Sequence, residues 1–260
     1  KPEALIRQAL RNGLSDGWGG SMCGTEFSDV LFGTPKPIDT EANLGVMVAE
    51  NVNIVVHGHD PSLSEMICEV ADDPEMIAYA KEMGAKGITI SGVCCTSNEV
   101  AMRRGIPMAG NFLQQENVVL TGACEAIVVD VQCIFPALGP LSKCFHTKFI
   151  TTSPIAQMPD SDYIEFSAGT ALEKAKEIVK TAIENFKNRK PDLVYIPDMK
   201  QKATVGYSVE AIVKTLDGVT NSQVDKTGTT KPLVDCITSG VIRGAVAMVG
   251  CNNPKIRPDY

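Results

Sequence analysis

The sequence lacks the features that mark several large protein classes. Aromatic residues make up only 5% of the 260 residues, and 31 acidic side chains outnumber 24 basic ones, for a net charge of −7. This balance argues against a nucleic-acid partner, because binding phosphates requires a basic face. No apolar run approaches the roughly 18 residues of a membrane span, and residues 1–20 have no signal-peptide pattern. We therefore expect a cytoplasmic protein with no membrane span.

Several catalytic and nucleotide-binding motifs are also missing. No GxGxxG follows the first apolar strand, and neither GxxxxGK[ST] nor HExxH occurs. A dinucleotide-binding fingerprint, a P-loop and a zinc-protease helix are thus not supported. Cysteine, in contrast, is abundant, with nine residues. An odd number in a chain of this size does not fit a disulfide-stapled secreted scaffold, so the position of each cysteine matters.

Apolar runs alternate with amphipathic segments from about residue 42 onward. Helical segments are expected at 4–10 and 24–33, before the alternation begins. Strands are predicted at 52–56, 86–95, 125–133, 146–154 and 244–251, and helices at 60–84, 99–105, 108–122, 169–190 and 207–218. Short, continuously apolar strands separated by helices predict a Rossmann-like α/β fold, with a parallel sheet and helices on both of its faces.

Four candidate metal ligands follow predicted strands. His59, Cys95, Cys133 and Cys251 each lie just after or at the end of an apolar run. Side chains that leave parallel strands at their carboxyl ends converge at one edge of the sheet, where ligands bind in open α/β folds. Three thiolates and one imidazole are soft donors, and this set favours an iron–sulfur or mixed-metal cluster over zinc or a hard cation.

Other interpretations of these residues remain open. The pattern alone does not decide between His57 and His59, since both could face the same side of an extended chain. In the pair Cys94–Cys95 we expect Cys95 to be the ligand and Cys94 to pack on the other side, with residues 96–98 capping the next helix. A cysteine nucleophile here, with His59 as its base, would leave Cys133 and Cys251 unexplained.

The remaining cysteines and the third histidine are interpreted as structural. We expect a packing role for five cysteines: Cys23, Cys68, Cys124, Cys144 and Cys236. His146 begins a predicted strand, so it belongs to the opposite edge of the sheet from the candidate ligands. A structural hydrogen bond is expected there.

Five long motifs resemble the catalytic subunit of the anaerobic nickel–iron–sulfur carbon monoxide dehydrogenases. They are "NIVVHGHDPSLSEMI", "SGVCCTSNEVAMRRGIPMAGNFLQQE", "VVDVQCIFP", "KCFHTKFITTSP" and "IRGAVAMVGCNNPK", in order within residues 15–255. The resemblance implies reversible oxidation of CO with water to CO2, two protons and two electrons. It also implies that His59 and Cys95 bind an iron outside a cubane, that Cys133 and Cys251 bind cubane irons, and that a metal-held hydroxide is the nucleophile.

The resemblance further implies three parts of a longer protein. Residues 1–36 correspond to the end of an N-terminal helical domain, 37–188 to a middle Rossmann-like domain, and 189–260 to the start of a second one. We expect the natural protein to continue beyond this chain, with more cluster ligands and [4Fe–4S] clusters there, and the chain alone to be inactive. A homodimer, a ferredoxin-type electron acceptor and an acetyl-CoA synthase subunit are the implied partners.

Two other classes of function are kept as alternatives. A hybrid-cluster-like hydroxylamine reductase shares the fold plan but requires carboxylate cluster ligands, and no strand end offers an obvious one. A non-catalytic α/β domain would use its cysteines for packing or for a structural metal. The preferred direction of the CO reaction is not visible in the sequence.

Overall fold

A computed structural model describes residues 1–220 and 229–246 of the chain. Its strands are β1 (Ile38–Ala42), β2 (Val52–His57), β3 (Ile88–Val93), β4 (Met108–Gly110), β5 (Cys124–Val129), β6 (Lys148–Thr151), β7 (Asp162–Tyr163) and β8 (Gln201–Val205). Its α-helices are α1 (Pro2–Asn12), α2 (Gly19–Phe32), α3 (Pro61–Ala71), α4 (Pro74–Glu82), α5 (Cys94–Arg104), α6 (Gln115–Leu120), α7 (Leu138–Cys144), α8 (Ala171–Asn185), α9 (Val209–Thr220) and α10 (Lys231–Thr238).

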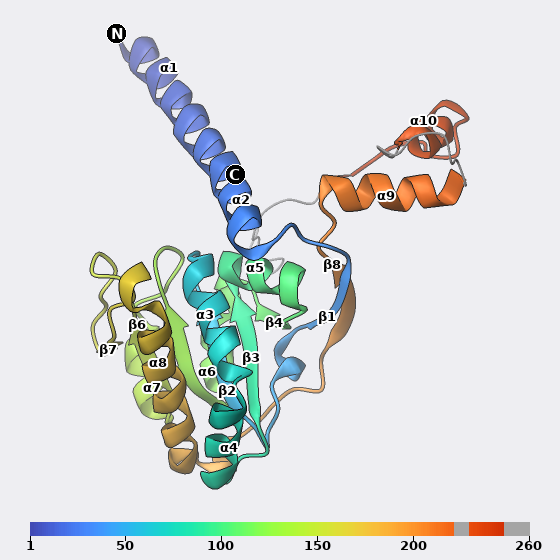
Figure 1. The fold of residues 1–260 in the computed structure, drawn as a ribbon. Helices are drawn as coiled ribbons and strands as arrows, with labels where there is room; N and C mark the ends of the chain where they lie inside the picture. The colour runs from blue at the N-terminus through green and yellow to red at the C-terminus, as the bar shows by residue number, and fades with distance from the viewer. Residues whose placement is uncertain (221–228, 247–260) are drawn as a thin grey trace.

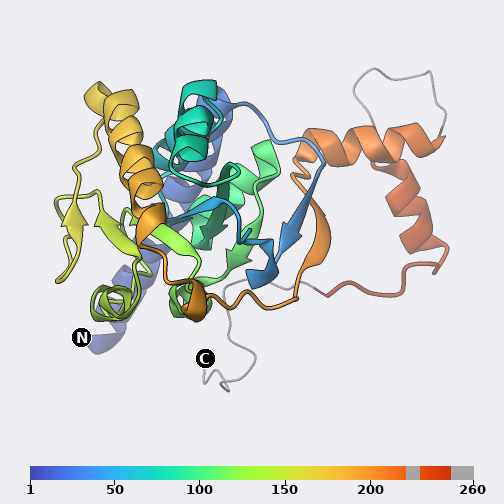
Figure 2. The same cartoon turned by 90° about the horizontal axis from the view of Figure 1, so that it is seen from below.

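One sheet of eight strands organises the described chain, in the order β7-β6-β5-β2-β3-β4-β1-β8. Every neighbouring pair is parallel except β1 and β8. Helices α3, α4 and α8 lie on one face and α6 and α7 on the other (Figures 1 and 2). The predicted α/β fold, with a parallel sheet covered on both faces, is confirmed.

The alternation of side chains along each strand divides the core in two. Ile54 and Val56 of β2 pack against α3 and α8, whereas Val55 between them belongs to the cluster under α6 and α7. In β6, Ile150 and Phe149 divide in the same way. Because both faces of the central strands are buried, their sequences are continuously apolar, as a covered parallel sheet requires.

The predicted helix 60–84 is two helices. Asp60 and Asp73 each accept a hydrogen bond from the backbone N–H two residues later, at the starts of α3 and α4. A proline follows each aspartate at the first helical position, where its missing N–H costs nothing. The second Asp-Pro pair therefore starts a new helix instead of continuing the first.

The N-terminal helical region is continuous, although the sequence predicts two separate helical segments at 4–10 and 24–33. A π-helical segment (Gly13–Trp18) joins α1 to α2, and the long helix stands away from the sheet (Figure 1). Arg103 of α5 anchors its end, donating to Asp29 of α2 at 2.7 Å and to the carbonyl of Gly33 at 2.8 Å.

Four strands, β1, β4, β7 and β8, were not predicted from the sequence, and β8 follows the expected domain junction. β1 and β8 contain charged residues, and β4 lies inside a segment predicted as helix. β8 pairs antiparallel with β1 over the whole of Ile38–Ala42. Beyond β8, α9 and α10 project from the sheet (Figure 1). The strand predicted at 244–251 falls mostly outside the described residues, and its first three residues form no strand.

Candidate metal centre

The connections after β2 and β5 diverge at the carboxyl edge of the sheet, which we define as the ends of β2, β3 and β5. β2 lies between β3 and β5, and the chain passes from β2 to β3 on one side but returns to β5 on the other. This is the topological switch point, where open α/β sheets bind their ligands. His59 follows β2 here, and Cys133 follows β5.

Asp130 joins these two connections. Its carboxylate accepts hydrogen bonds from the backbone N–H groups of His59, at 2.7 and 2.8 Å, and of Asp60, at 2.5 Å, and also from that of Val131. Burial raises the pKa of the Asp130 carboxyl, while these backbone donors act in the opposite direction. Gly58 has a φ of 124°, and a Cβ there would lie 1.9 Å from Asp130 Oδ1. Only glycine fits this position.

The two neighbouring histidines have different surroundings. The half-buried His59 has Nδ1 2.9 Å from the carbonyl oxygen of Val131. Since a carbonyl can only accept, Nδ1 carries a proton, and in the neutral ring the lone pair is therefore on Nε2, as in histidines that bind metals. His57 is 1% exposed and its Nε2 lies 2.9 Å from Gln115 Oε1. Burial lowers the pKa of His57 to about 4, so its ring is neutral.

Cys95 lies in the first turn of α5, and this helix begins earlier than predicted. α5 starts at Cys94 directly after β3, without a side-chain cap from residues 96–98. Thr96 turns instead toward the connection after β2: its N–H donates to Gly58 O at 2.9 Å, and its hydroxyl lies 3.1 Å from Asp60 O. Cys94 is buried, as predicted for a packing residue, and Cys95 is exposed.

Cys133 is exposed on a backbone of unusual conformation. Gln132 and Cys133 have φ values of 61° and 56°, and Cys94 at the neighbouring strand end has 67°. Residues with a Cβ adopt this left-handed region at a cost of roughly 1–2 kcal/mol each. Three such residues at one edge show that the surrounding contacts impose the conformation.

Three of the four predicted ligands, His59, Cys95 and Cys133, reach the same edge, but they do not form a single-ion site. His59 Nδ1 contacts the segment that leads to Cys133, and Thr96 ties the helix of Cys95 to the segment that contains His59. Within residues 1–220 and 229–246, no group of three His, Cys, Asp or Glu side chains has the arrangement to hold one ion. Cys251 lies outside the described residues.

The other cysteines are divided between the core and the surface. Cys68 and Cys124 are buried, as predicted, and burial raises the pKa of Cys68 to about 12. The packing role predicted for Cys23 and Cys144 is wrong for this chain, since both side chains are exposed. Cys236 is partly exposed. The sequence around such cysteines contains few apolar residues. It therefore does not predict whether the thiol is buried in the core or exposed on the surface.

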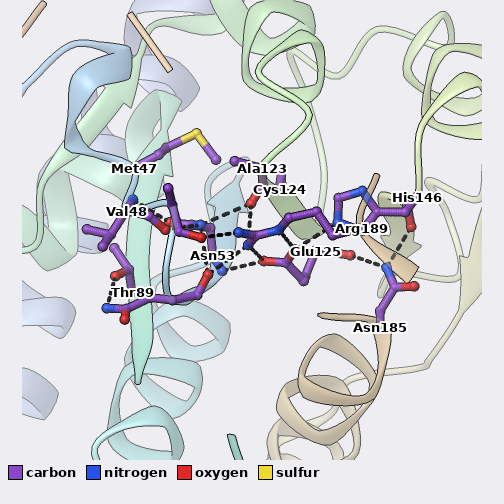
Figure 3. A network of polar contacts seen from close by, with 12 residues as sticks. Met47, Val48, Asn53, Thr89, Ala123, Cys124, Glu125, His146, Asn185 and Arg189 are labelled. Atoms are coloured by element: carbon purple, nitrogen blue, oxygen red, sulfur yellow. Dashed lines mark hydrogen bonds and ion pairs between the residues drawn. The ribbon is translucent and has the colours of Figure 1, made fainter. Parts of the chain in front are cut away.

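A buried polar network occupies the opposite, amino edge of the sheet, where β2 and β5 begin (Figure 3). Glu125 of β5 is fully buried and accepts from Arg189 Nε at 2.8 Å and from Arg189 Nη2 at 2.7 Å. Its carboxylate also lies 2.7 Å from His146 Nε2 and accepts from the N–H of Asn53 at 2.6 Å. Asn185 donates to the carbonyls of Glu125 and His146. The structural hydrogen bond predicted for His146 is thus confirmed.

Comparisons with known proteins identify the family of the chain. The Prismane/CO dehydrogenase family model matches residues 1–260. A carbon monoxide dehydrogenase of Methanosarcina mazei is 53% identical over 256 residues, which cover 98% of this chain and 39% of that protein. The carbon monoxide dehydrogenase/acetyl-CoA synthase subunit beta of Moorella thermoacetica is 44% identical, over 98% of this chain and 37% of its own length.

Solved structures of carbon monoxide dehydrogenases are also similar to this chain. The nickel-free crystal structure of carbon monoxide dehydrogenase from Thermococcus sp. AM4 superposes with a TM-score of 0.91 at 52% identity, over 100% of this chain and 40% of that one. The chain therefore spans about two fifths of the length of the proteins it matches. In the part that the structure describes, no helix is long and apolar enough to cross a membrane.

Proposed function

Because this chain belongs to the Prismane/CO dehydrogenase family, we propose that it is the central part of an anaerobic nickel–iron–sulfur carbon monoxide dehydrogenase. The reaction is the reversible oxidation of CO with water to CO2, two protons and two electrons. The observation that carries the proposal is the state of His59: at the switch point of the sheet, its Nδ1 is engaged by Val131 O and its Nε2 is left for a metal.

The donor set fits a nickel–iron–sulfur cluster. We propose His59 and Cys95 as ligands of an iron outside the cubane, and Cys133 and Cys251 as ligands of cubane irons. Thiolates and imidazole suit such soft centres. A multi-metal cluster also separates its ligands more widely than one ion does, which is consistent with the absence of a single-ion site in the described residues. When bound, the cluster supplies a metal that binds CO, a metal that activates water, and a store for two electrons.

The chain's own residues hold the ligands in place. Asp130 fixes the backbone of His59, and Val131 O orients its ring. The first turn of α5 presents Cys95 at the positive end of the helix dipole, which favours an anionic ligand. His57 and Gln115 occupy the buried side of the same edge and exclude water from beneath it.

The partners and the parts of the whole protein are also proposals. We propose further [4Fe–4S] clusters and the remaining ligands outside this chain, a homodimer in an anaerobic cytoplasm, and a ferredoxin-type electron acceptor. An acetyl-CoA synthase partner is supported by similarity to the Moorella subunit. The parts proposed are 1–36, 37–188 and 189–260. The protruding helix supports the first boundary, while β8 extends the middle sheet beyond the second.

Metal content tests the ligand assignment. In the full-length enzyme purified without oxygen, Cys95→Ala and Cys133→Ala are each expected to abolish CO-dependent dye reduction and to lower nickel and iron per chain. Cys144→Ala, at an exposed thiol on α7, is the matched control and keeps all three. Retained metal and activity in Cys133→Ala would overturn the assignment. Iron without nickel in the unaltered enzyme would favour the hydroxylamine reductase, and zinc alone a structural site.

A further inference from the structure

Gln115, at the start of α6, is a fully buried amide whose hydrogen-bonding capacity is completely used. Its Oε1 accepts from the N–H of Phe135 at 2.8 Å and lies 2.9 Å from His57 Nε2. Its Nε2 donates to the carbonyl of Cys133 at 2.9 Å and to that of Phe112. One side chain thus connects the end of β2, the start of α6 and the segment that carries Cys133.

The partners fix both the amide and the imidazole. A backbone N–H can only donate and a carbonyl can only accept, so Oε1 faces Phe135 and Nε2 faces Cys133. His57 Nε2 therefore carries a proton and donates to Gln115 Oε1. The imidazole packs at the end of β2, 1% exposed, and holds the amide from its other side.

The hydrogen bonds of Gln115 hold the backbone segment with the least favourable φ values at this edge. They reach the carbonyl of Cys133 and the N–H of Phe135, directly after the two left-handed residues Gln132 and Cys133. Loss of these bonds removes the side-chain contacts at both ends of this short segment, which can then relax toward an ordinary conformation. Such a change redirects the Cys133 thiol.

We propose that Gln115, oriented by His57, is a positioning residue that sets the direction of the Cys133 thiolate toward the cluster. The inference rests on the proposed function, since it requires Cys133 to be a ligand. Gln115 touches neither substrate nor metal and acts through the backbone of Cys133. Groups that orient metal ligands change metal affinity or activity by about 10- to 100-fold when they are removed.

The test compares two buried amides at opposite edges of the sheet, in the full-length enzyme purified without oxygen. Gln115→Met keeps the length of the side chain but removes all four hydrogen bonds. Gln115→Glu keeps both acceptor contacts but cannot donate to Cys133 O, and it provides the milder variant if Gln115→Met folds poorly. Asn185→Leu is the control, because it removes three hydrogen bonds of a buried amide far from the ligands.

Both Gln115 variants are expected to shift the electron paramagnetic resonance spectrum of the cluster and to lower nickel content or CO oxidation by about 10-fold. Faster hydrogen exchange at the Phe135 amide in Gln115→Met locates the change. Asn185→Leu lowers the unfolding midpoint and leaves the spectrum unaltered. If the Gln115 variants do only the same, the positioning role is overturned. If Cys133→Ala keeps the cluster spectrum, the ligand assignment falls, and the positioning role falls with it.

Discussion

The two edges of the central sheet differ in how their polar groups are paired and exposed. At the amino edge, Glu125 and Arg189 are buried together, and their donors and acceptors are engaged within the chain. At the carboxyl edge, three non-glycine residues have positive φ, and the thiols of Cys95 and Cys133 are exposed. The amino edge is satisfied by contacts within the chain, whereas the carboxyl edge leaves two thiols accessible, as the proposed cluster requires.

This difference separates the groups that stabilise the sheet from those that are able to bind or react. The network around Glu125 is saturated with hydrogen bonds inside the chain. It holds the strands to the segment after α8 that carries Arg189, but it offers no group to a ligand. Unfavourable backbone conformations at the other edge lower stability and place side chains that can react or bind. The same strand, β5, begins in the first environment and leads into the second.

The largest expected effect comes from breaking the amino edge. Glu125→Ala leaves the Arg189 guanidinium, 8% exposed, without its carboxylate. Loss of one partner of a buried ion pair costs about 3–5 kcal/mol, so we expect the free energy of unfolding to fall by that amount in urea titrations. Glu177→Ala, which removes an exposed pair with Lys174, is the control and changes it by less than about 1 kcal/mol. Equal losses in the two variants would refute the assigned role of the network.

A smaller effect is expected at the carboxyl edge. Gly58→Ala combines a positive φ of 124° with a collision against Asp130, and we expect a loss of about 3 kcal/mol in the same titration. Gly84→Ala has a φ of 96° with nothing within 4 Å of the new Cβ, and about 1 kcal/mol is expected from backbone strain alone. If the two alanine variants lose the same free energy of unfolding, the collision with Asp130 does not explain the requirement for glycine at position 58.

The smallest expected effect is a difference in reactivity between two thiols, one at the start of β5 and one just after its end. In the metal-free full-length protein at pH 8, iodoacetamide is expected to modify Cys133 and to spare Cys124, with peptide mass spectrometry as the measurement. Cys124 is fully buried, and burial raises the pKa of its thiol well above the usual value. Cys68 serves as a second protected site and Cys144 as a second reactive one. Modification of Cys124 in the folded protein would contradict the closed amino edge.

The central strands were predictable because local pattern and tertiary position agree there. β2, β3, β5 and β6 are apolar on both faces, and that pattern is present in the sequence itself. β1 and β8 are polar segments more than 150 residues apart, and their pairing is determined by tertiary contacts. β4 has three residues, too few for any periodic signal.

The candidate site was predictable to a similar extent. The positions of His59, Cys95 and Cys133 at one edge follow from strand order, and the structure places them there. Gln115 was missed because it begins a short helix in a segment predicted as one long helix, and its partners come from other elements. Glu125 carried a usable signal, a single acid in an apolar strand, which requires a buried partner. The identity of that partner, Arg189, is visible only in the fold.

The bond between Glu125 and Arg189 has a consequence for the order in which the chain assembles during synthesis. Arg189 follows Glu125 by 64 residues. At ribosomal rates of roughly 5–20 residues per second, the carboxylate is therefore made roughly 3–13 s before its guanidinium. During that interval the carboxylate has only His146 and the Asn53 N–H as partners, so burying it is less favourable than after its ion pair can form. We therefore expect the amino edge of the sheet to close fully only once Arg189 has been made.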